Sequence, residues 1–157
     1  MESRIGINGG HSQSVAELLA KLLADEFLLS LKTRNAHWNI EDPNFLSLHK
    51  LFETQYGELD TIVDDVAERI RSLGHFAPAS MKSFLSLTHL TEAGREKNDG
   101  RGFITELLHD HEDIIIRIRS QINELALSYH DVGTSDFFTG LMKTHEKMAW
   151  MLRAHVG

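Results

Sequence analysis

Cysteine is absent from the 157 residues of this chain. Its absence excludes disulfides, iron–sulfur clusters and thiolate zinc sites. A metal ion could then be held only by histidine, carboxylate, carbonyl or water, a donor set that suits iron, manganese or zinc. The absence also fits a reducing compartment, so we expect a cytoplasmic protein.

Long apolar runs and an excess of basic residues are also missing. No run approaches the length of a membrane span, and the first residues, MESRIGINGG, lack the basic-then-apolar pattern of a secretion signal. The formal net charge is -7, which disfavours general binding to DNA phosphates. A negative surface could attract cations, or it could simply aid solubility.

The first half of the chain predicts a helical hairpin, because apolar residues recur at steps of three and four. We expect the first helix to start at Ser12 or Ser14 and to run to about Asn39; Ser14 with Glu17 resembles a capping box. A turn over residues 41–44 follows, with Asn44 as a plausible N-cap. The second helix then continues to Gly74, a common C-terminal cap residue.

The second half predicts another hairpin, with helices from near Gly102 and from about Ser135. The link between the two halves, residues 74–100, contains a short helical stretch over 80–85. A link of that length can return along a whole bundle, as the one long crossover of ferritin-like bundles does. We therefore predict an all-α, ferritin-like four-helix bundle with a short extra helix in the crossover. It forms one domain over 1–157, with a flexible tail over 1–12.

Polar residues line one border of the apolar stripe of the second helix: His49, Glu53, Asp60, Asp64 and Glu68. Residues four apart on a helix are neighbours, so His49 with Glu53 and Asp64 with Glu68 can each aim at one point. His37 lies on the adjoining helix. These residues are either metal ligands or polar side chains at the margin of a buried face.

The two pairs are too far apart to meet within one chain. His49 and Asp64 are separated by about 22 Å along the helix, whereas metal–ligand bonds are about 2 Å long. A two-fold axis near Glu58 would join His49 with Glu68 and Glu53 with Asp64 from two antiparallel copies of the helix, giving two identical sites. Gly57 lies beside that axis and would allow close approach of the helices, although a neutral glycine is the alternative.

Three segments, AHWN, LHKLFE and DDVAERIRSLG, resemble the Dps family of small ferritin-like proteins that form hollow dodecamers. The similarity covers about residues 14–155. It implies a di-iron site between two-fold-related subunits, with His37, His49 and Glu53 from one chain and Asp64 and Glu68 from the other. The family usually has aspartate where this chain has Glu53, which puts occupancy of the second iron position in doubt.

The resemblance implies oxidation of Fe(II), preferably by hydrogen peroxide, and storage of the Fe(III) mineral inside a dodecamer. It places Trp38 near the iron, where it could supply or quench an oxidising equivalent; packing at the interface is the alternative. It also implies entry through acidic three-fold pores, for which Asp131 and Asp136 are the candidates. A charge that favours the helix dipole is the alternative for Asp136.

Other readings compete with this one. A conventional ferritin needs a Glu-x-x-His on each of two helices, and only Glu106 with His109 fits, which disfavours an intrachain site. The run HDHED, residues 109–113, is either a second metal candidate through His109 and Asp113 or a solvated or cavity-facing stripe. His145 lies on an apolar stripe and is expected to be a hydrogen-bonded core histidine.

Two further functional classes remain open. Some members of the family bind and compact DNA, commonly through lysine-rich tails, which implies association with the nucleoid as the alternative localisation. The leading segment here contains Arg4 and no lysine, so we expect no DNA binding and keep it as the alternative. A purely structural cage without working metal sites is the other.

Overall fold

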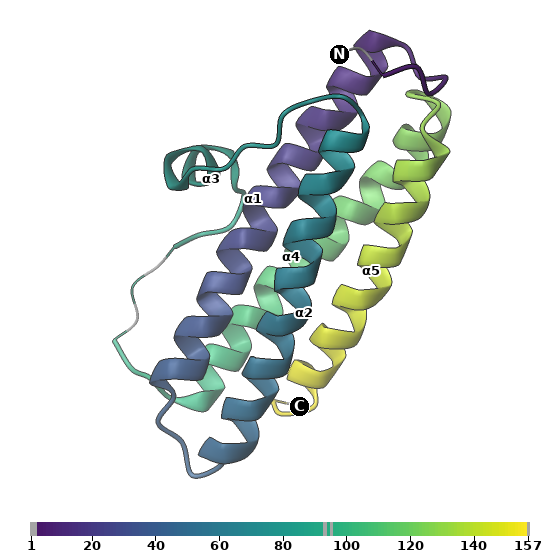
Figure 1. Cartoon of the computed structure of the whole chain (residues 1–157). Helices are drawn as coiled ribbons and strands as arrows, with labels where there is room; N and C mark the ends of the chain where they lie inside the picture. Colours follow the sequence, from purple (N-terminus) through teal and green to yellow (C-terminus); the bar gives the residue numbers. More distant parts are fainter. Residues whose placement is uncertain (1–2, 93, 95, 157) are drawn as a thin grey trace.

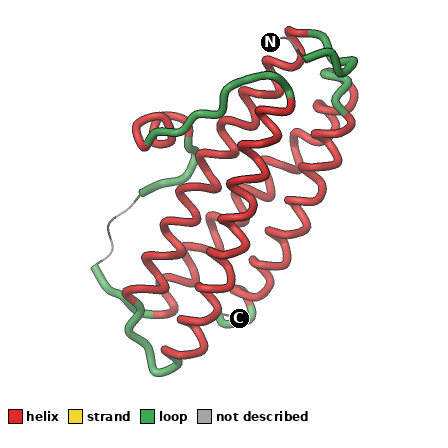
Figure 2. Tube along the Cα trace, viewed as in Figure 1, coloured by secondary structure: helices red, strands yellow, loops and turns green. Residues whose placement is uncertain are grey.

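The computed structural model describes residues 3–92, 94 and 96–156, and these form helices without any strand (Figures 1 and 2). Four long helices make the bundle, and a short one lies beside it: α1 (Gly9–Asn39), α2 (Phe45–Ser72), α3 (Met81–Leu87), α4 (Gly100–Leu127) and α5 (Val132–Arg153). This confirms the all-α, ferritin-like bundle. No helix of the described residues combines the length and apolar character needed to cross a membrane.

The bundle consists of two antiparallel hairpins, α1 with α2 and α4 with α5. The described residues between α2 and α4 return along the length of the bundle, so that α4 runs parallel to α2 (Figure 1). The link between α2 and α4 contacts α1 at two points. Phe84 of α3 stacks on Phe27 with ring centroids 4.6 Å apart. The buried carboxylate of Asp25 accepts hydrogen bonds of 2.7 Å from the Thr88 hydroxyl and the His89 backbone N–H.

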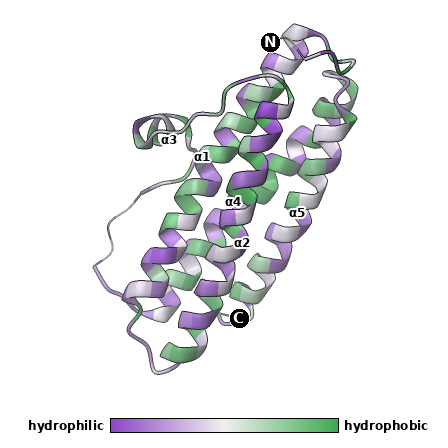
Figure 3. Cartoon of the chain, in the orientation of Figure 1, coloured by the Kyte–Doolittle hydropathy of each residue, from purple (hydrophilic) through white to green (hydrophobic). Residues whose placement is uncertain are grey.

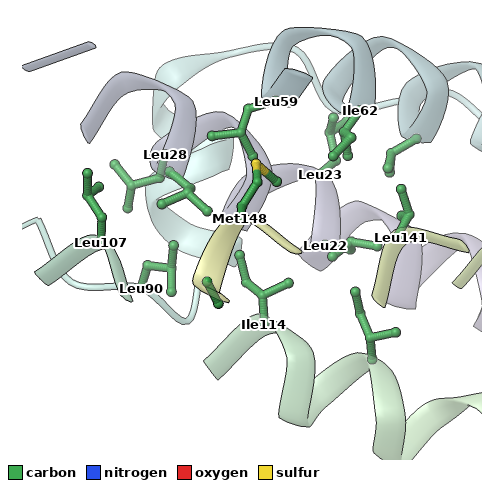
Figure 4. Packing of buried hydrophobic residues seen from close by; sticks show 14 of the residues in the cluster. Leu22, Leu23, Leu28, Leu59, Ile62, Leu90, Leu107, Ile114, Leu141 and Met148 are labelled. Carbon is green, nitrogen blue, oxygen red and sulfur yellow. The ribbon is translucent and has the colours of Figure 1, made fainter. Parts of the chain in front are cut away.

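One apolar stripe from each long helix points inward, and together they form a continuous core (Figures 3 and 4). The fully buried side chains include three phenylalanines, Phe52, Phe103 and Phe138. Burying each side chain of this size contributes about 1.5–3 kcal/mol. Because this core occupies the inner faces, the polar border of α2 remains available at the surface.

The starts of α1, α4 and α5 differ from the sequence prediction, whereas the start of α2 at Phe45 and the end of α2 agree with it. α1 begins at Gly9, because Asn8 caps it by accepting a hydrogen bond of 2.8 Å from the His11 N–H, so the start at Ser12 or Ser14 was wrong. Residues 9–12 therefore belong to the helix. At the far end of the hairpin, Gly74 has φ +93° and the His75 N–H bonds to the Ile70 carbonyl, as in a Schellman cap.

The second hairpin also begins earlier than the apolar pattern indicated. α4 starts at Gly100 and α5 at Val132, each preceded by an aspartate whose side chain caps the helix, Asp99 and Asp131. Apolar periodicity marks where a helix packs, and the polar first turn of each helix lies outside that pattern.

Candidate metal centre

His37 and His49 meet at the closed end of the first hairpin, where α1 ends and α2 begins. Their rings stack with centroids 3.7 Å apart and an interplanar angle of 15°. The Nδ1 atom of His37 lies 2.7 Å from the carbonyl oxygen of His49, and Nδ1 of His49 lies 2.8 Å from the carbonyl oxygen of His37. Each ring is thus held by the backbone beside the other.

This reciprocal arrangement determines the tautomer of both rings. A carbonyl oxygen can only accept a hydrogen bond, so each Nδ1 must carry the proton. In the neutral imidazole, Nε2 then has a free lone pair, and histidine binds metals through such a nitrogen. A metal-ligating histidine typically donates its other N–H to a carbonyl or carboxylate, which fixes the ring and raises its basicity. Both histidines therefore have the hydrogen bonding of metal ligands.

Neighbouring aromatic residues restrict the two rings further. Phe45 stacks on the His49 ring at a centroid distance of 4.9 Å, and Tyr56 meets the edge of His37 at 5.2 Å. His37 is only 8 % exposed. A ligand held this way needs little reorganisation when a metal arrives.

Arg34 and Asp60 form a brace beside these rings that the sequence analysis missed. The guanidinium of Arg34 donates to both oxygens of Asp60, at 2.9 and 2.5 Å, and the Ser30 hydroxyl donates to the same carboxylate at 2.8 Å. The hydrogen bond from Arg34 lowers the pKa of Asp60. Asp60 is thus occupied by an arginine, although it shares the helix border with the candidate ligands. Nothing in the spacing showed that Arg34 lies opposite it.

The carboxylates of α2 are exposed and lie in two groups. Glu53 is one helical turn beyond His49, so it adjoins the two histidines. Asp64 and Glu68 are neighbours of each other, but Asp64 lies about 22 Å along the helix from His49. The protomer therefore brings His37 and His49 together, with Glu53 close by, and leaves Asp64 and Glu68 apart. Within the described residues, no group of three histidines or carboxylates is arranged to hold a metal ion.

Trp38 and the two pore candidates have different surroundings. Trp38 is 63 % exposed. Asp131 is only 2 % exposed: it caps α5 by accepting a 2.8 Å bond from the Thr134 N–H, and Arg69 donates to it at 3.0 Å. We therefore correct its assignment from pore residue to helix cap. Asp136 is exposed in the second turn of α5, where the helix dipole has little effect, so it remains the pore candidate.

A second polar group lies inside the bundle, remote from the surface. His145 donates from Nε2 to the Glu26 carboxylate at 2.8 Å, and its Nδ1 lies 2.9 Å from Nδ1 of His111. All three side chains are 0 % exposed. This confirms His145 as a hydrogen-bonded core histidine. Burial lowers the pKa of His111 well below its usual value, and His145 lowers it further.

The run HDHED is not a solvated stripe throughout, so that expectation was wrong for two of its residues. His109 and Asp113 are exposed, whereas His111 is buried and Asp110 is 8 % exposed. Asp110 pairs with Lys32 at 2.5 Å, although burial dominates and raises its pKa. Lys32 also contacts Glu106 at 3.1 Å. In the protomer, Glu106 is thus paired with Lys32, which disfavours its use in an intrachain iron site.

Comparisons with known proteins identify the relatives of this chain. A family model described as a ferritin-like domain matches residues 16–157. The chain is 40 % identical over 152 residues to an uncharacterized low temperature-induced protein of Nostoc sp., covering 97 % of this chain and 85 % of that one. It is 35 % identical to DNA protection during starvation protein 2 of Bacillus anthracis, covering 91 % and 97 %.

Solved structures of similar fold are also Dps proteins. The crystal structure of the Dps protein from Vibrio cholerae O1 matches with a TM-score of 0.92 and 32 % identity, covering 100 % of this chain and 98 % of that one. That protein is described as a member of a broad superfamily of ferritin-like diiron-carboxylate proteins. Dps from Thermosynechococcus elongatus matches with a TM-score of 0.88 and 28 % identity, covering 94 % and 93 %.

Proposed function

Because this chain belongs to the ferritin-like proteins and, within them, to the Dps family, we propose that it oxidises Fe(II) and stores the Fe(III) product. Oxidation takes place at sites shared by two subunits, with hydrogen peroxide as the preferred oxidant. The mineral is kept inside a hollow dodecamer in the cytoplasm. Iron is thus both substrate and cargo.

The observation that carries this proposal is the pair of stacked histidines. Their Nδ1 protons are bonded to backbone carbonyls, which leaves two Nε2 lone pairs free, and the exposed Glu53 follows His49 by one helical turn. Imidazole binds iron without adding negative charge, and carboxylates are hard donors that favour Fe(III) over Fe(II). This donor set therefore holds Fe(II) and assists its oxidation.

Asp64 and Glu68 complete the site when they come from a second copy of the chain. A two-fold axis near Glu58 sets two α2 helices antiparallel, so that His49 and Glu53 of one protomer face Glu68 and Asp64 of the partner subunit. The exposure of Glu53, Asp64 and Glu68 supports this, because their carboxylates remain accessible to a partner subunit.

Replacing Gly57 by alanine tests the close approach of the two helices. Within the protomer, a Cβ atom at Gly57 would meet nothing within 4 Å. Helix propensity alone therefore predicts that Gly57→Ala stabilises the chain by about 1 kcal/mol. We expect instead that it weakens the assembly, because the added methyl meets the partner helix. Sedimentation velocity at a series of protein concentrations measures the change.

Gly140→Ala is the matched control, since a Cβ at Gly140 in α5 also meets nothing within 4 Å. It should keep the wild-type assembly. If Gly57→Ala assembles as tightly as Gly140→Ala, the two-fold axis does not pass where we place it.

Two irons and one peroxide make a balanced reaction. Each Fe(II) gives one electron, hydrogen peroxide accepts both with two protons, and two water molecules form. Because the oxygen–oxygen bond is broken by an electron pair, no hydroxyl radical is released. Asp136, exposed on α5, is our candidate for the acidic pore through which Fe(II) enters.

DNA binding is the second candidate. The names of several relatives refer to DNA protection, which is said of those proteins. This chain has a formal charge of -7 and no lysine before Lys21, so electrostatic binding to phosphates is disfavoured. Removal of Fe(II) and peroxide would protect DNA without any contact.

Crystals soaked in Fe(II) test the proposed site directly. Anomalous scattering at the iron edge should reveal ions beside His37, His49 and Glu53 of one protomer, with Asp64 and Glu68 of the partner subunit completing the shell. Iron located only inside a single bundle, or residues 49 and 64 of different protomers remaining far apart, would contradict the proposal.

A further inference from the structure

The oxidisable aromatic ring that contacts the histidine pair is Tyr56. It meets the edge of His37 with ring centroids 5.2 Å apart and an interplanar angle of 77°. Trp38 follows His37 in the chain but leaves α1 about 100° away from it and is 63 % exposed. Tyr56 is therefore the oxidisable ring from which an electron can reach iron on His37 through a direct ring contact.

Arg34 determines the form in which Tyr56 can lose an electron. Its guanidinium carbon lies 4.5 Å from the centroid of the Tyr56 ring. The hydrogen bond with Asp60 raises the pKa of Arg34, so the guanidinium remains charged. A cation on the face of an aromatic ring opposes a second positive charge on that ring. Oxidation of Tyr56 must then release the phenol proton and leave a neutral phenoxyl radical.

The same contacts hold the ring still. Asp60 is bound by Arg34 and by Ser30, so the guanidinium that covers Tyr56 is fixed at its other end. Tyr56 is half-buried between Arg34 and His37. A radical formed there is partly shielded from solvent, in contrast to one on exposed Trp38.

Building on the proposed iron oxidation, we propose that Tyr56 supplies the second electron when a site holds a single Fe(II). Hydrogen peroxide then takes one electron from Fe(II) and one from the phenol. It accepts the phenol proton and one proton from solvent, giving Fe(III), a tyrosyl radical and two water molecules. A later Fe(II), with one proton from solvent, reduces the radical back to tyrosine and becomes Fe(III).

Without this donor, a singly loaded site has only one electron to give. Peroxide would then be split into hydroxide and a free hydroxyl radical, which damages the protein and its surroundings. Tyr56 thus extends the protection of the two-iron reaction to sites that are half full.

The chain is well suited to a test, because it has only two tyrosines, Tyr56 and Tyr129. Tyr129 follows the end of α4, towards the opposite end of the bundle from His37 (Figure 1). The assembled protein is loaded with one Fe(II) per chain, mixed with one equivalent of hydrogen peroxide, and frozen for electron paramagnetic resonance. A parallel sample contains a spin trap for hydroxyl radical.

We expect a tyrosyl signal in the wild type and in Tyr129→Phe. Tyr56→Phe keeps the ring that packs on His37 but lacks the phenol, so it should lose the signal and give several-fold more hydroxyl adduct. Trp38→Phe should keep the signal. A signal that persists in Tyr56→Phe, or that disappears in Trp38→Phe, overturns the inference.

Failure of the proposed function would look different. If the wild type does not consume Fe(II) with peroxide, iron oxidation itself is wrong and the inference falls with it. If iron is oxidised but no tyrosyl signal forms at one Fe(II) per chain, only the role of Tyr56 is wrong.

Discussion

Co-assembly of two inactive variants should restore about a quarter of the wild-type rate of iron oxidation, because an isologous interface separates the two halves of each site. His37→Ala removes a ligand from the histidine half, and Asp64→Asn removes one from the carboxylate half. Assembled alone, each variant should lose at least about tenfold in rate, since even residues behind the ligands of a metal site typically contribute 10–100-fold.

The expected recovery follows from counting subunit pairs. Equal amounts of two variants that pair at random give about half mixed pairs across a two-fold interface. In each mixed pair, one site receives both defects and the other receives none. Half of the pairs with half of their sites intact makes one quarter. The initial rate of Fe(II) oxidation by peroxide, measured on co-expressed and doubly tagged protein, gives the number.

A mixture with both defects in the same half is the matched control. His37→Ala with His49→Ala should restore nothing, because every site still receives a damaged histidine half. Equal recovery in the two mixtures would show that activity returns through assembly and not through shared sites. No recovery in the first mixture, with normal assembly, would place the complete site within one chain.

Helix periodicity was sufficient to predict the fold. It gave two hairpins and showed that residues 74–100 must return along the bundle, because only a long link lets α2 and α4 run parallel. It was less informative at helix starts. Asn8, Asp99 and Asp131 each cap a first turn that makes little contact with the core, so the apolar pattern began too late.

The sequence predicted those parts of the site in which two residues share a face of one helix. His49 with Glu53, and Asp64 with Glu68, share a face by their separation alone. Contacts between helices could not be predicted from the sequence. Nothing in it shows that Arg34 pairs with Asp60, or that the ring in contact with His37 belongs to Tyr56 and not to Trp38. The burial and ion pairing of Asp131 were missed for the same reason, because its partner Arg69 lies on another helix.

The buried positions of Glu26 and His111 could have been predicted from the apolar pattern of their helices. Glu26 follows Leu22 and Leu23 by one turn and precedes Leu29, so it lies on the inward stripe of α1. His111 lies in the same way between Leu107 and Ile114 on α4. A charged or polar residue in the middle of an apolar stripe predicts a buried partner, although it does not identify that partner.

Removal of Glu26 should destabilise the protein more than almost any other single side-chain deletion. Burial keeps His111 neutral, and the three side chains form one hydrogen-bonded chain: Nε2 of His145 donates to the Glu26 carboxylate, and Nδ1 of His145 shares a hydrogen bond with Nδ1 of His111. Glu26→Ala leaves the His145 N–H without an acceptor in a region that is 0 % exposed, and it opens a cavity beside it. Breaking such a buried pair typically costs about 3–5 kcal/mol.

A graded series of substitutions separates the lost hydrogen bond from a general effect of mutation. Glu26→Gln keeps the shape and an acceptor oxygen, so it should cost only about 1 kcal/mol. Asp113→Ala removes an exposed carboxylate from α4 and should change stability by less than about 0.5 kcal/mol. At about 2–4 °C per kcal/mol for a chain of this size, Glu26→Ala should lower Tm by about 6–20 °C. All variants are compared at one protomer concentration, because assembly shifts the apparent stability. Equal Tm values for Glu26→Ala and Asp113→Ala would mean that the Glu26–His145–His111 chain does not hold the three helices together.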